Sequence, residues 1–242
     1  MKILFIGESW HIHMIHSKGY DSFTSSKYEE GADYLLSCLR QQNITIDYMP
    51  AHIVQTRFPQ TVEELDIYDA IVISDIGSNT FLLQNKTFYH MNIIPNALAL
   101  IKEYVSNGGG LLMIGGYLSF TGIEAKANYK NTLLAEVLPV EMLEHDDRVE
   151  GCCPINTEEQ HVITQDLTQW PPLLGYNKLR AKVNSITLVK INDDPLLVLG
   201  EYNKGKVGCF ASDCAPHWGS PQFMQWEHYK SFWCNVLQAI KK

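Results

Sequence analysis

The chain has 242 residues, of which 45% are hydrophobic and 19% are charged, and its formal net charge is −8. This length suits one large domain with a sizeable core, so we expect a single domain over residues 1–242. The chain carries no run of Lys and Arg, so we expect no nucleic-acid partner. No stretch approaches the length of a membrane span, and Ile3–Gly7 is too short for a secretion signal. We therefore expect a cytoplasmic protein with no membrane partner.

Six cysteines are present, and the vicinal pair Cys152-Cys153 lacks the C-x-x-C spacing of redox and zinc motifs. Chains of this size in the cytosol rarely contain disulfides. We expect free thiols, most of them buried as small hydrophobic side chains.

The first half alternates apolar strands with helices. We expect strands at Lys2–Gly7, Ile44–Met49, Asp69–Ser74 and Leu111–Ile114. We expect helices over Tyr28–Gln42, from the capping box at Thr61, and from Pro95 to Val105. The segment after the first strand is expected to be a loop. This alternation predicts a doubly wound, mainly parallel sheet with helices on both faces.

The second half is richer in β-structure. After a short helix over Leu133–Leu138, the region Val140–Ile163 looks irregular. Ser185–Lys190, Leu196–Tyr202 and Lys206–Ala211 then read as antiparallel strands, the last two joined at Asn203-Lys204-Gly205. A closing helix over about Pro221–Ile240 carries aromatic residues that mostly suit a core. The predicted class is α/β with a β-rich second-half elaboration.

The stretch Gly108–Phe120 reads as a short strand that ends in a glycine-rich turn. In an open parallel sheet, ligands bind beyond the carboxyl ends of the strands. Paired glycines there, Gly115 and Gly116, permit a sharp turn and close backbone approach to a ligand. Nucleophile elbows have this form, and this one offers Tyr117 and Ser119 but no cysteine.

Three stretches, Gly109–Gly122, Leu138-Pro139-Val140 and Asp213–Gly219, resemble the class I glutamine amidotransferase-like superfamily. The likeness is greatest to the bacterial family labelled putative glutamine amidotransferase. It implies a flavodoxin-like fold over nearly the whole chain.

In active members of that superfamily the elbow carries a cysteine, and a late histidine has an acid two residues on. His217 matches that histidine, but Gly219 stands at the acid and the thiol is absent. The resemblance therefore implies a protein without the usual glutaminase chemistry, because an unassisted hydroxyl is a far weaker nucleophile than a thiolate. Other branches that lost the triad serve as binding or oligomerisation domains.

One interpretation of the remaining side chains is catalytic. Ser119 could act as nucleophile and His217 as base, with Asp213 or Glu227 orienting the imidazole. The alternatives are that Ser119 caps a helix or turn and that His217 is a buried histidine bonded to backbone.

A second interpretation is ligand binding at the strand ends. The candidate ligand-binding residues are Gly7, Glu8, Asp75, Ser78, Gly116, Tyr117 and Trp218. Glu8 could instead cap a helix, and Tyr117 could instead fill the space of a missing cysteine. No G-x-G-x-x-G or Walker sequence occurs, so phosphate binding is disfavoured.

His11, His13 and His16 cluster in the segment expected to be a loop. No Cys or acidic residue lies at matching ligand spacing, so we expect no metal site, and no cofactor is indicated.

Three functions remain open. The first is an amidotransferase-like domain that binds a small polar ligand or a partner subunit without glutaminase activity. The second is an amide or ester hydrolase that uses Ser119 and His217. The third is a structural domain that assembles a homo-oligomer, and a homo-oligomer is the expected state.

Overall fold

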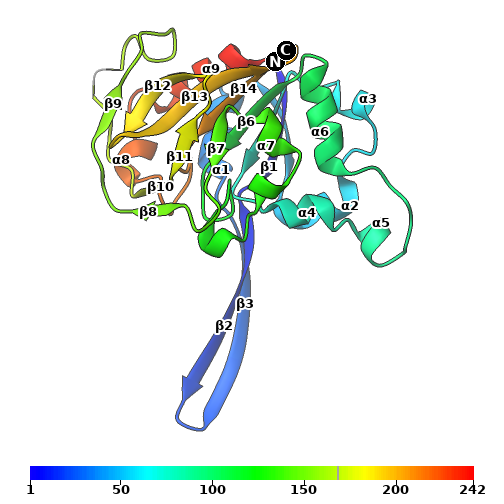
Figure 1. The fold of residues 1–242 in the computed structure, drawn as a ribbon. Coiled ribbons are helices and arrows are strands. Elements are labelled where there is room, and N and C mark those ends of the chain that lie inside the picture. The colour runs from blue at the N-terminus through cyan, green and yellow to red at the C-terminus, as the bar shows by residue number, and fades with distance from the viewer. Residues whose placement is uncertain (168) are drawn as a thin grey trace.

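In the computed structural model, which describes residues 1–167 and 169–242, one eight-stranded sheet runs through the molecule (Figure 1). Its order is β4-β1-β5-β6-β14-β13-β12-β9. The parallel strands are β1 (Lys2–Gly7), β4 (Thr45–Met49), β5 (Ala70–Ser74), β6 (Gly110–Ile114) and β14 (Gly205–Phe210). Taken in chain order these five read 2-1-3-4-5, which is the flavodoxin-like arrangement. The α/β prediction is confirmed, and the order reverses between β1 and β5.

Continuous apolar runs explain the central strands. All five residues of β5 and of β6 are buried, which is typical of parallel strands covered on both faces. The helices are α1 (Asp33–Arg40), α2 (Ala51–Arg57), α3 (Val62–Leu65), α4 (Ser78–Leu82), α5 (Asn85–Phe88), α6 (Ala97–Ser106), α7 (Leu134–Val137), α8 (Pro221–Met224) and α9 (Tyr229–Ile240). Helices α1 and α9 pack together on one face of the sheet, whereas α2, α4 and α6 pack on the other.

The second half completes the sheet with antiparallel strands β13 (Asp194–Tyr202), β12 (Ile186–Ile191) and β9 (Ile155–Thr157). The predicted turn between β13 and β14 is confirmed, with Asn203 in the left-handed region at φ 52°. Two short pairs lie beside the sheet: β7 (Val140–Met142) with β11 (Leu179–Ala181), and β8 (Arg148–Glu150) with β10 (Gly175–Asn177). The expectation of an irregular Val140–Ile163 is thus wrong in part, since strands of three residues are too short to show a period.

The closing segment is two helices, α8 and α9, and not the single expected helix. Ser220 accepts a hydrogen bond from the Phe223 backbone at the start of α8, and the helix ends after one turn. The core role of the aromatic residues is confirmed for the four that are at most 1% exposed: Phe223, Tyr229, Phe232 and Trp233.

The largest departure from the sequence prediction is a hairpin formed by β2 (Ser9–Lys18) and β3 (Asp21–Glu30), which we call the arm. Figure 1 shows it leaving the body at the carboxyl end of β1 and standing clear of the rest of the chain. The segment was expected to be a loop and α1 to begin at Tyr28, but α1 begins only at Asp33. Apolar residues alternate with histidines only over Trp10–Met14 in β2, and β3 is mostly polar and exposed, so the pattern covers too little of the arm to predict a hairpin.

The cysteines are all free, but only Cys209 and Cys214 are buried, so the expectation that most are buried is wrong. No helix in the described part of the chain is both long enough and apolar enough to span a bilayer.

A pair of glycines tests how closely the paired ends of β1 and β5 approach each other. Gly7 has φ +102° and a Cβ there would lie 2.0 Å from the Ser74 carbonyl oxygen, whereas Gly151 has φ +113° and open space around it. Gly151→Ala should lower the free energy of unfolding by about 1 kcal/mol through backbone strain alone, and Gly7→Ala by roughly 3 kcal/mol or more. Urea unfolding measures both, and equal losses would show that the strands can separate to admit the methyl group.

Candidate functional site

Four turns meet at the carboxyl ends of β1, β5, β6 and β14. Each carries a residue with positive φ: Glu8 at 50°, Asp75 at 39°, Gly116 at 147° and His217 at 124°. Non-glycine residues rarely adopt such angles, and backbone strain of this kind clusters at functional sites. The turns therefore mark this edge of the sheet as the candidate site.

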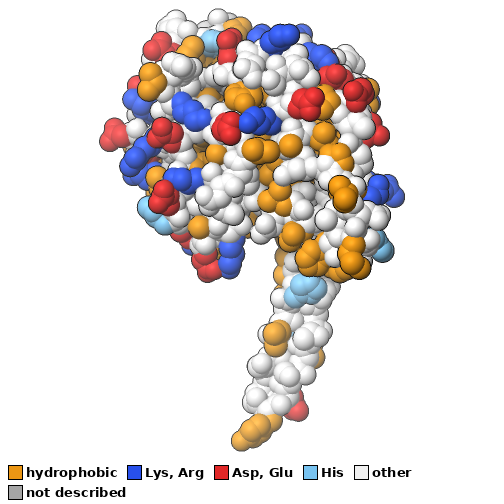
Figure 2. All heavy atoms as spheres, turned by 45° about the vertical axis from the view of Figure 1, so that its right-hand side comes forward, with side chains coloured by type: hydrophobic (Ala, Val, Ile, Leu, Met, Phe, Trp, Pro, Cys, Tyr) orange, Lys and Arg blue, Asp and Glu red, His pale blue; other side chains and the backbone are white. Residues whose placement is uncertain are grey.

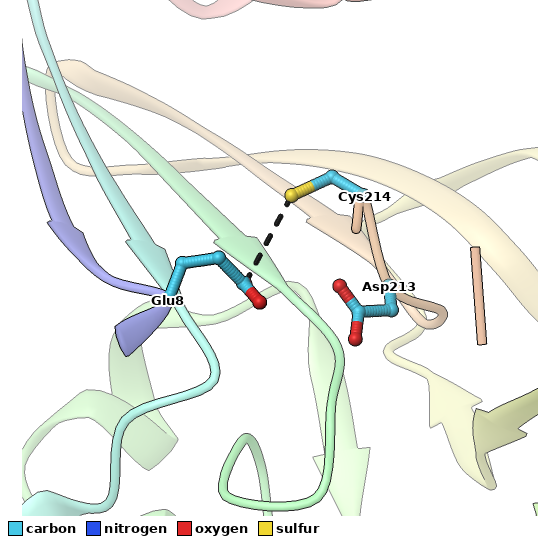
Figure 3. Close-up of side chains that lie close together, drawn as sticks. All are labelled: Glu8, Asp213 and Cys214. Carbon is cyan, nitrogen blue, oxygen red and sulfur yellow. Dashed lines mark hydrogen bonds between the residues drawn. The ribbon is translucent and has the colours of Figure 1, made fainter. Parts of the chain in front are cut away.

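Two of these turns bring buried acids together in what we call the acid cluster: Glu8, Asp213 and Cys214. One ligand atom from each lies within 4.8 Å of the others, and Figure 3 shows the two carboxyl groups and the thiol converging. Ser74, at the end of β5, donates a hydrogen bond to Glu8 Oε2 at 2.5 Å, and the Cys214 thiol lies 4.0 Å from the same oxygen. All three side chains of the cluster are at most 1% exposed.

Burial sets the ionisation of the acid cluster. It raises the pKa of Glu8 to about 8, and repulsion from Asp75 adds to the shift. Burial likewise raises the pKa of Asp213 well above its usual range, with Glu8 and Asp75 adding to it. The pKa of the Cys214 thiol is raised for the same reason, so this thiol is a poor nucleophile at neutral pH.

Two oxygens of the acid cluster have no partner among the described residues. Glu8 Oε1 and Asp213 Oδ2 are both fully buried and make no hydrogen bond. Buried acceptors are nearly always satisfied, and each exception needs a reason.

The elbow after β6 is held by side chains bonded to backbone. Ser119 Oγ donates to the Ile114 carbonyl oxygen at 2.6 Å and accepts from the Asp75 backbone N–H at 3.1 Å. Asp75 Oδ1 in turn accepts from Leu118 N at 2.6 Å. The Ser119 side chain is fully buried, and its described hydrogen bonds go to backbone groups and none to His217. This arrangement matches the structural alternative, in which the hydroxyl secures a turn.

Beside the elbow lies a group of rings that we call the aromatic cluster: Trp10, Tyr117, His217 and Trp218. His217 is exposed, Trp10 and Tyr117 are half-buried, and Trp218 is buried beneath Tyr117. The His217 ring lies 5.0 Å from Trp10 and 5.5 Å from Tyr117, measured between centroids. Tyr117 also lies 5.2 Å from Trp218. His217 is exposed, which differs from the alternative of a buried histidine.

Two carboxylates flank the aromatic cluster. The Trp10 indole N–H donates to Glu29 Oε2 at 3.2 Å, and the Trp218 indole N–H donates to Glu150 Oε2 at 3.1 Å. Trp10 and Glu29 come from the base of the arm, so the arm forms one wall of the cluster (Figure 1).

The structure therefore gathers most of the predicted site residues at one edge: Gly7, Glu8, Asp75, Gly116, Tyr117, Asp213, His217 and Trp218. Ser78 is buried at the start of α4, with a hydroxyl that has no described partner. Glu227 is 84% exposed and lies beside His228, so it does not support His217.

Sequence reasoning missed Trp10, Glu29, Ser74 and Cys214. Trp10 and Glu29 join the site only because the arm forms. Ser74 and Cys214 lie next to residues already singled out, so their position at strand ends was a usable signal.

The chain matches the model of the family described as "Putative glutamine amidotransferase" over residues 2–242. It is 78% identical to the cytoplasmic protein STM1381 from Salmonella typhimurium LT2 and 63% identical to the cytoplasmic protein STM3548 from Salmonella typhimurium; each match covers 100% of both chains with a TM-score of 0.98. A ThuA-like protein from Bacteroides uniformis shares the fold at 12% identity, over 92% of this chain and 87% of that one, with a TM-score of 0.54. No curated protein matches the chain.

The acid cluster predicts how stability depends on pH. A carboxyl group whose pKa is raised in the folded state stabilises that state below its unfolded pKa, and this contribution is lost as pH rises through the folded pKa. In chelator-treated protein, the free energy of unfolding should therefore fall between about pH 4.5 and 8. Glu8→Gln should make the decrease in the free energy of unfolding over this pH range smaller by at least about 1.4 kcal/mol, the equivalent of one pKa unit.

The matched control is Glu103→Gln, which removes an exposed carboxylate from α6 and should leave the slope unchanged. Urea unfolding at several pH values measures all three proteins. A Glu8→Gln profile parallel to that of the wild type would contradict the assignment.

Proposed function

Because this chain belongs to the Putative glutamine amidotransferase family, we propose that it keeps the ligand-binding edge of the fold without the glutaminase reaction. The observation that carries the proposal is the side chain at the elbow after β6. Tyr117 stands in the region where the resemblance calls for a cysteine, and its ring contacts His217 and Trp218. A ring in that place occupies the position from which a nucleophile would act.

The other candidate nucleophiles are unsuited to hydrolysis. The Ser119 hydroxyl is fully buried and donates to a backbone carbonyl, so it lacks the hydrogen bond to a base that activates serine. The Cys214 thiol is buried beside two carboxyl groups that favour its neutral form. His217 lies at an angle against the rings of Trp10 and Tyr117, and Gly219 stands two residues after it, where an acid would be needed. These features disfavour the Ser119–His217 hydrolase.

The ligand class follows from the groups around the aromatic cluster. Aromatic faces attract cations and pack against apolar edges. Glu29 and Glu150 accept hydrogen bonds but cannot donate them when ionised. Arg148, 5.7 Å from the Tyr117 ring centre, is engaged by both oxygens of Asp146. The site therefore suits a small polar molecule with an ammonium group and hydroxyls, such as an amino sugar or amino alcohol.

We infer that the protein binds its ligand in the cytoplasm. Both Salmonella relatives are described as cytoplasmic proteins, and each covers the whole of this chain.

The first test compares the binding of three sugars that differ in charge. Glucosamine carries an ammonium group, glucose is neutral, and glucuronate carries a carboxylate. Trp10 and Trp218 line the cluster, so their fluorescence should change on binding. Glucosamine should bind at least tenfold more tightly than glucose, since a charge-assisted hydrogen bond is worth about 1.4 kcal/mol or more. Glu150→Gln should reduce that preference, and Glu141→Gln, an exposed carboxylate on β7, should not. Equal or tighter binding of glucuronate would contradict the assigned ligand class.

Glutamine hydrolysis gives the second test. Ammonia release from glutamine should stay at the uncatalysed rate for the wild type, and Ser119→Ala should not change it. Turnover by the wild type that disappears in Ser119→Ala would restore the hydrolase interpretation.

A second role, assembly of a homo-oligomer, is favoured by the arm. A lone two-stranded hairpin is at best marginally stable in water, and its outer edges present unpaired backbone groups. Beyond its base, the arm's described side-chain hydrogen bonds join only its own strands, as in His13 with Ser26 and His16 with Ser25. Ile15 is 77% exposed and Phe23 is 56% exposed, and Figure 2 shows apolar side chains along the arm and at its tip.

A second apolar segment lies near the arm. The α5 region exposes Phe88, Tyr89, Met91 and Ile93, and Figure 1 places it at the lower edge of the body, from which the arm also leaves. Exposed apolar patches of this kind mark interfaces. A second copy of the chain is the proposed partner, because a two-fold axis would bring an identical unpaired edge against each arm.

Light scattering coupled to size exclusion tests this role. The wild type should have at least twice the monomer mass at micromolar concentration, and the double variant Ile15→Lys/Phe23→Lys should shift toward the monomer. Ser17→Lys/Ser22→Lys places the same charges at exposed polar positions of the arm and should retain the oligomer. A monomeric wild type would contradict the assembly role.

A further inference from the structure

The acid cluster, formed by the turns after β1 and β14, is not used by the proposed function. It combines a carboxylate from the turn after β1 with a carboxylate and a thiol from the turn after β14. Their ligand atoms lie within 4.8 Å of one another and point into a common space (Figure 3). The cluster contains a thiol in addition to two carboxyl groups, so it offers both sulfur and oxygen as ligand atoms.

Two unpartnered atoms indicate that something belongs in this space. Glu8 Oε1 and Asp213 Oδ2 are fully buried and have no hydrogen-bond partner among the described residues. The remaining oxygens are satisfied, Glu8 Oε2 by Ser74 and Asp213 Oδ1 by the Ala215 backbone N–H at 2.9 Å. Each carboxylate thus keeps one oxygen fixed by the protein and one oxygen free. Supporting hydrogen bonds of this kind orient ligands around metal ions.

Charge points in the same direction. Among the described residues, no Lys or Arg forms an ion pair with Glu8 or Asp213, so the protein itself places no cation beside these two carboxyl groups.

We propose that Glu8, Asp213 and Cys214 form a binding site for one zinc ion. A thiolate together with two carboxylates suits zinc better than magnesium or calcium, which prefer oxygen ligands alone. Zinc bonds of about 2.0–2.3 Å place ligand atoms roughly 3.3–3.8 Å apart, so small side-chain rotations close the present spacing. Three protein ligands leave a fourth position open.

The surroundings of the cluster bear on how an ion could reach it. Gly31 leaves room beside Glu8, since a Cβ there would lie 2.9 Å from Glu8 Oε1. Pro216 and His217 are exposed on the same turn that carries Asp213 and Cys214, so that turn reaches the surface. This site departs from the expectation of no metal site, which considered only the histidines of the arm.

Metal content and a cobalt spectrum test the site in the full-length chain. After incubation with zinc and desalting, elemental analysis should give one zinc per chain. Cobalt in its place should produce a thiolate-to-metal charge-transfer band, which reports on the sulfur ligand directly. Cys214→Ser should abolish the band, and Asp213→Asn should weaken zinc binding at least tenfold.

Two controls separate this site from others. Cys209→Ser removes the other buried thiol and should keep the band. The triple variant His11→Ala/His13→Ala/His16→Ala should still bind one zinc. A wild type that takes up well under one zinc per chain overturns the proposal, and so does uptake that is lost in the arm variant but kept in Cys214→Ser. The wild-type measurement needs no substitution, so it decides the question even if a variant fails to fold.

Discussion

The constraint on which this structure depends is the burial of carboxyl groups where parallel strands end. Glu8 follows β1, Asp75 follows β5 and Asp213 follows β14, and the parallel sheet brings these three ends to one edge. Glu8 and Asp213 are fully buried, and Asp75 is half-buried. Removing them from water disfavours their ionised forms, and their mutual repulsion adds to that effect. The surrounding turns, with positive φ at Glu8, Asp75 and His217, hold the groups together against this repulsion.

The arm extends from the site at the strand ends to the exposed surface: its base contacts the site, and its outer part is exposed. Its base provides Trp10, which lies against His217, and Ser9, which accepts a hydrogen bond from the Ala51 backbone N–H at the start of α2. Its outer part contacts little of its own chain. Since one hairpin contributes both to the aromatic cluster and to the exposed apolar surface, ligand binding and assembly involve adjacent residues of the same element.

Sequence alone predicted the sheet because the strands are apolar runs separated by capped helices, as β5 and α6 illustrate. It also predicted that the turns carrying Glu8, Asp75 and His217 would lie at one edge of the sheet, since parallel strand ends share an edge. It did not predict the arm, because the alternation in β2 is short and β3, which pairs residues such as Ser26 with His13, is mostly polar and exposed. Nor could it place Cys214 beside Glu8, since two turns 206 residues apart along the chain determine that contact.

The suppressed ionisation of the buried edge can be measured by carbon-13 NMR of glutamate carboxyl groups, followed across pH in chelator-treated protein. One glutamate should titrate near pH 8, and its signal should be missing in Glu8→Gln. A spectrum in which every glutamate titrates near the usual 4.5 or below would show that the buried edge does not suppress ionisation, and would contradict the account.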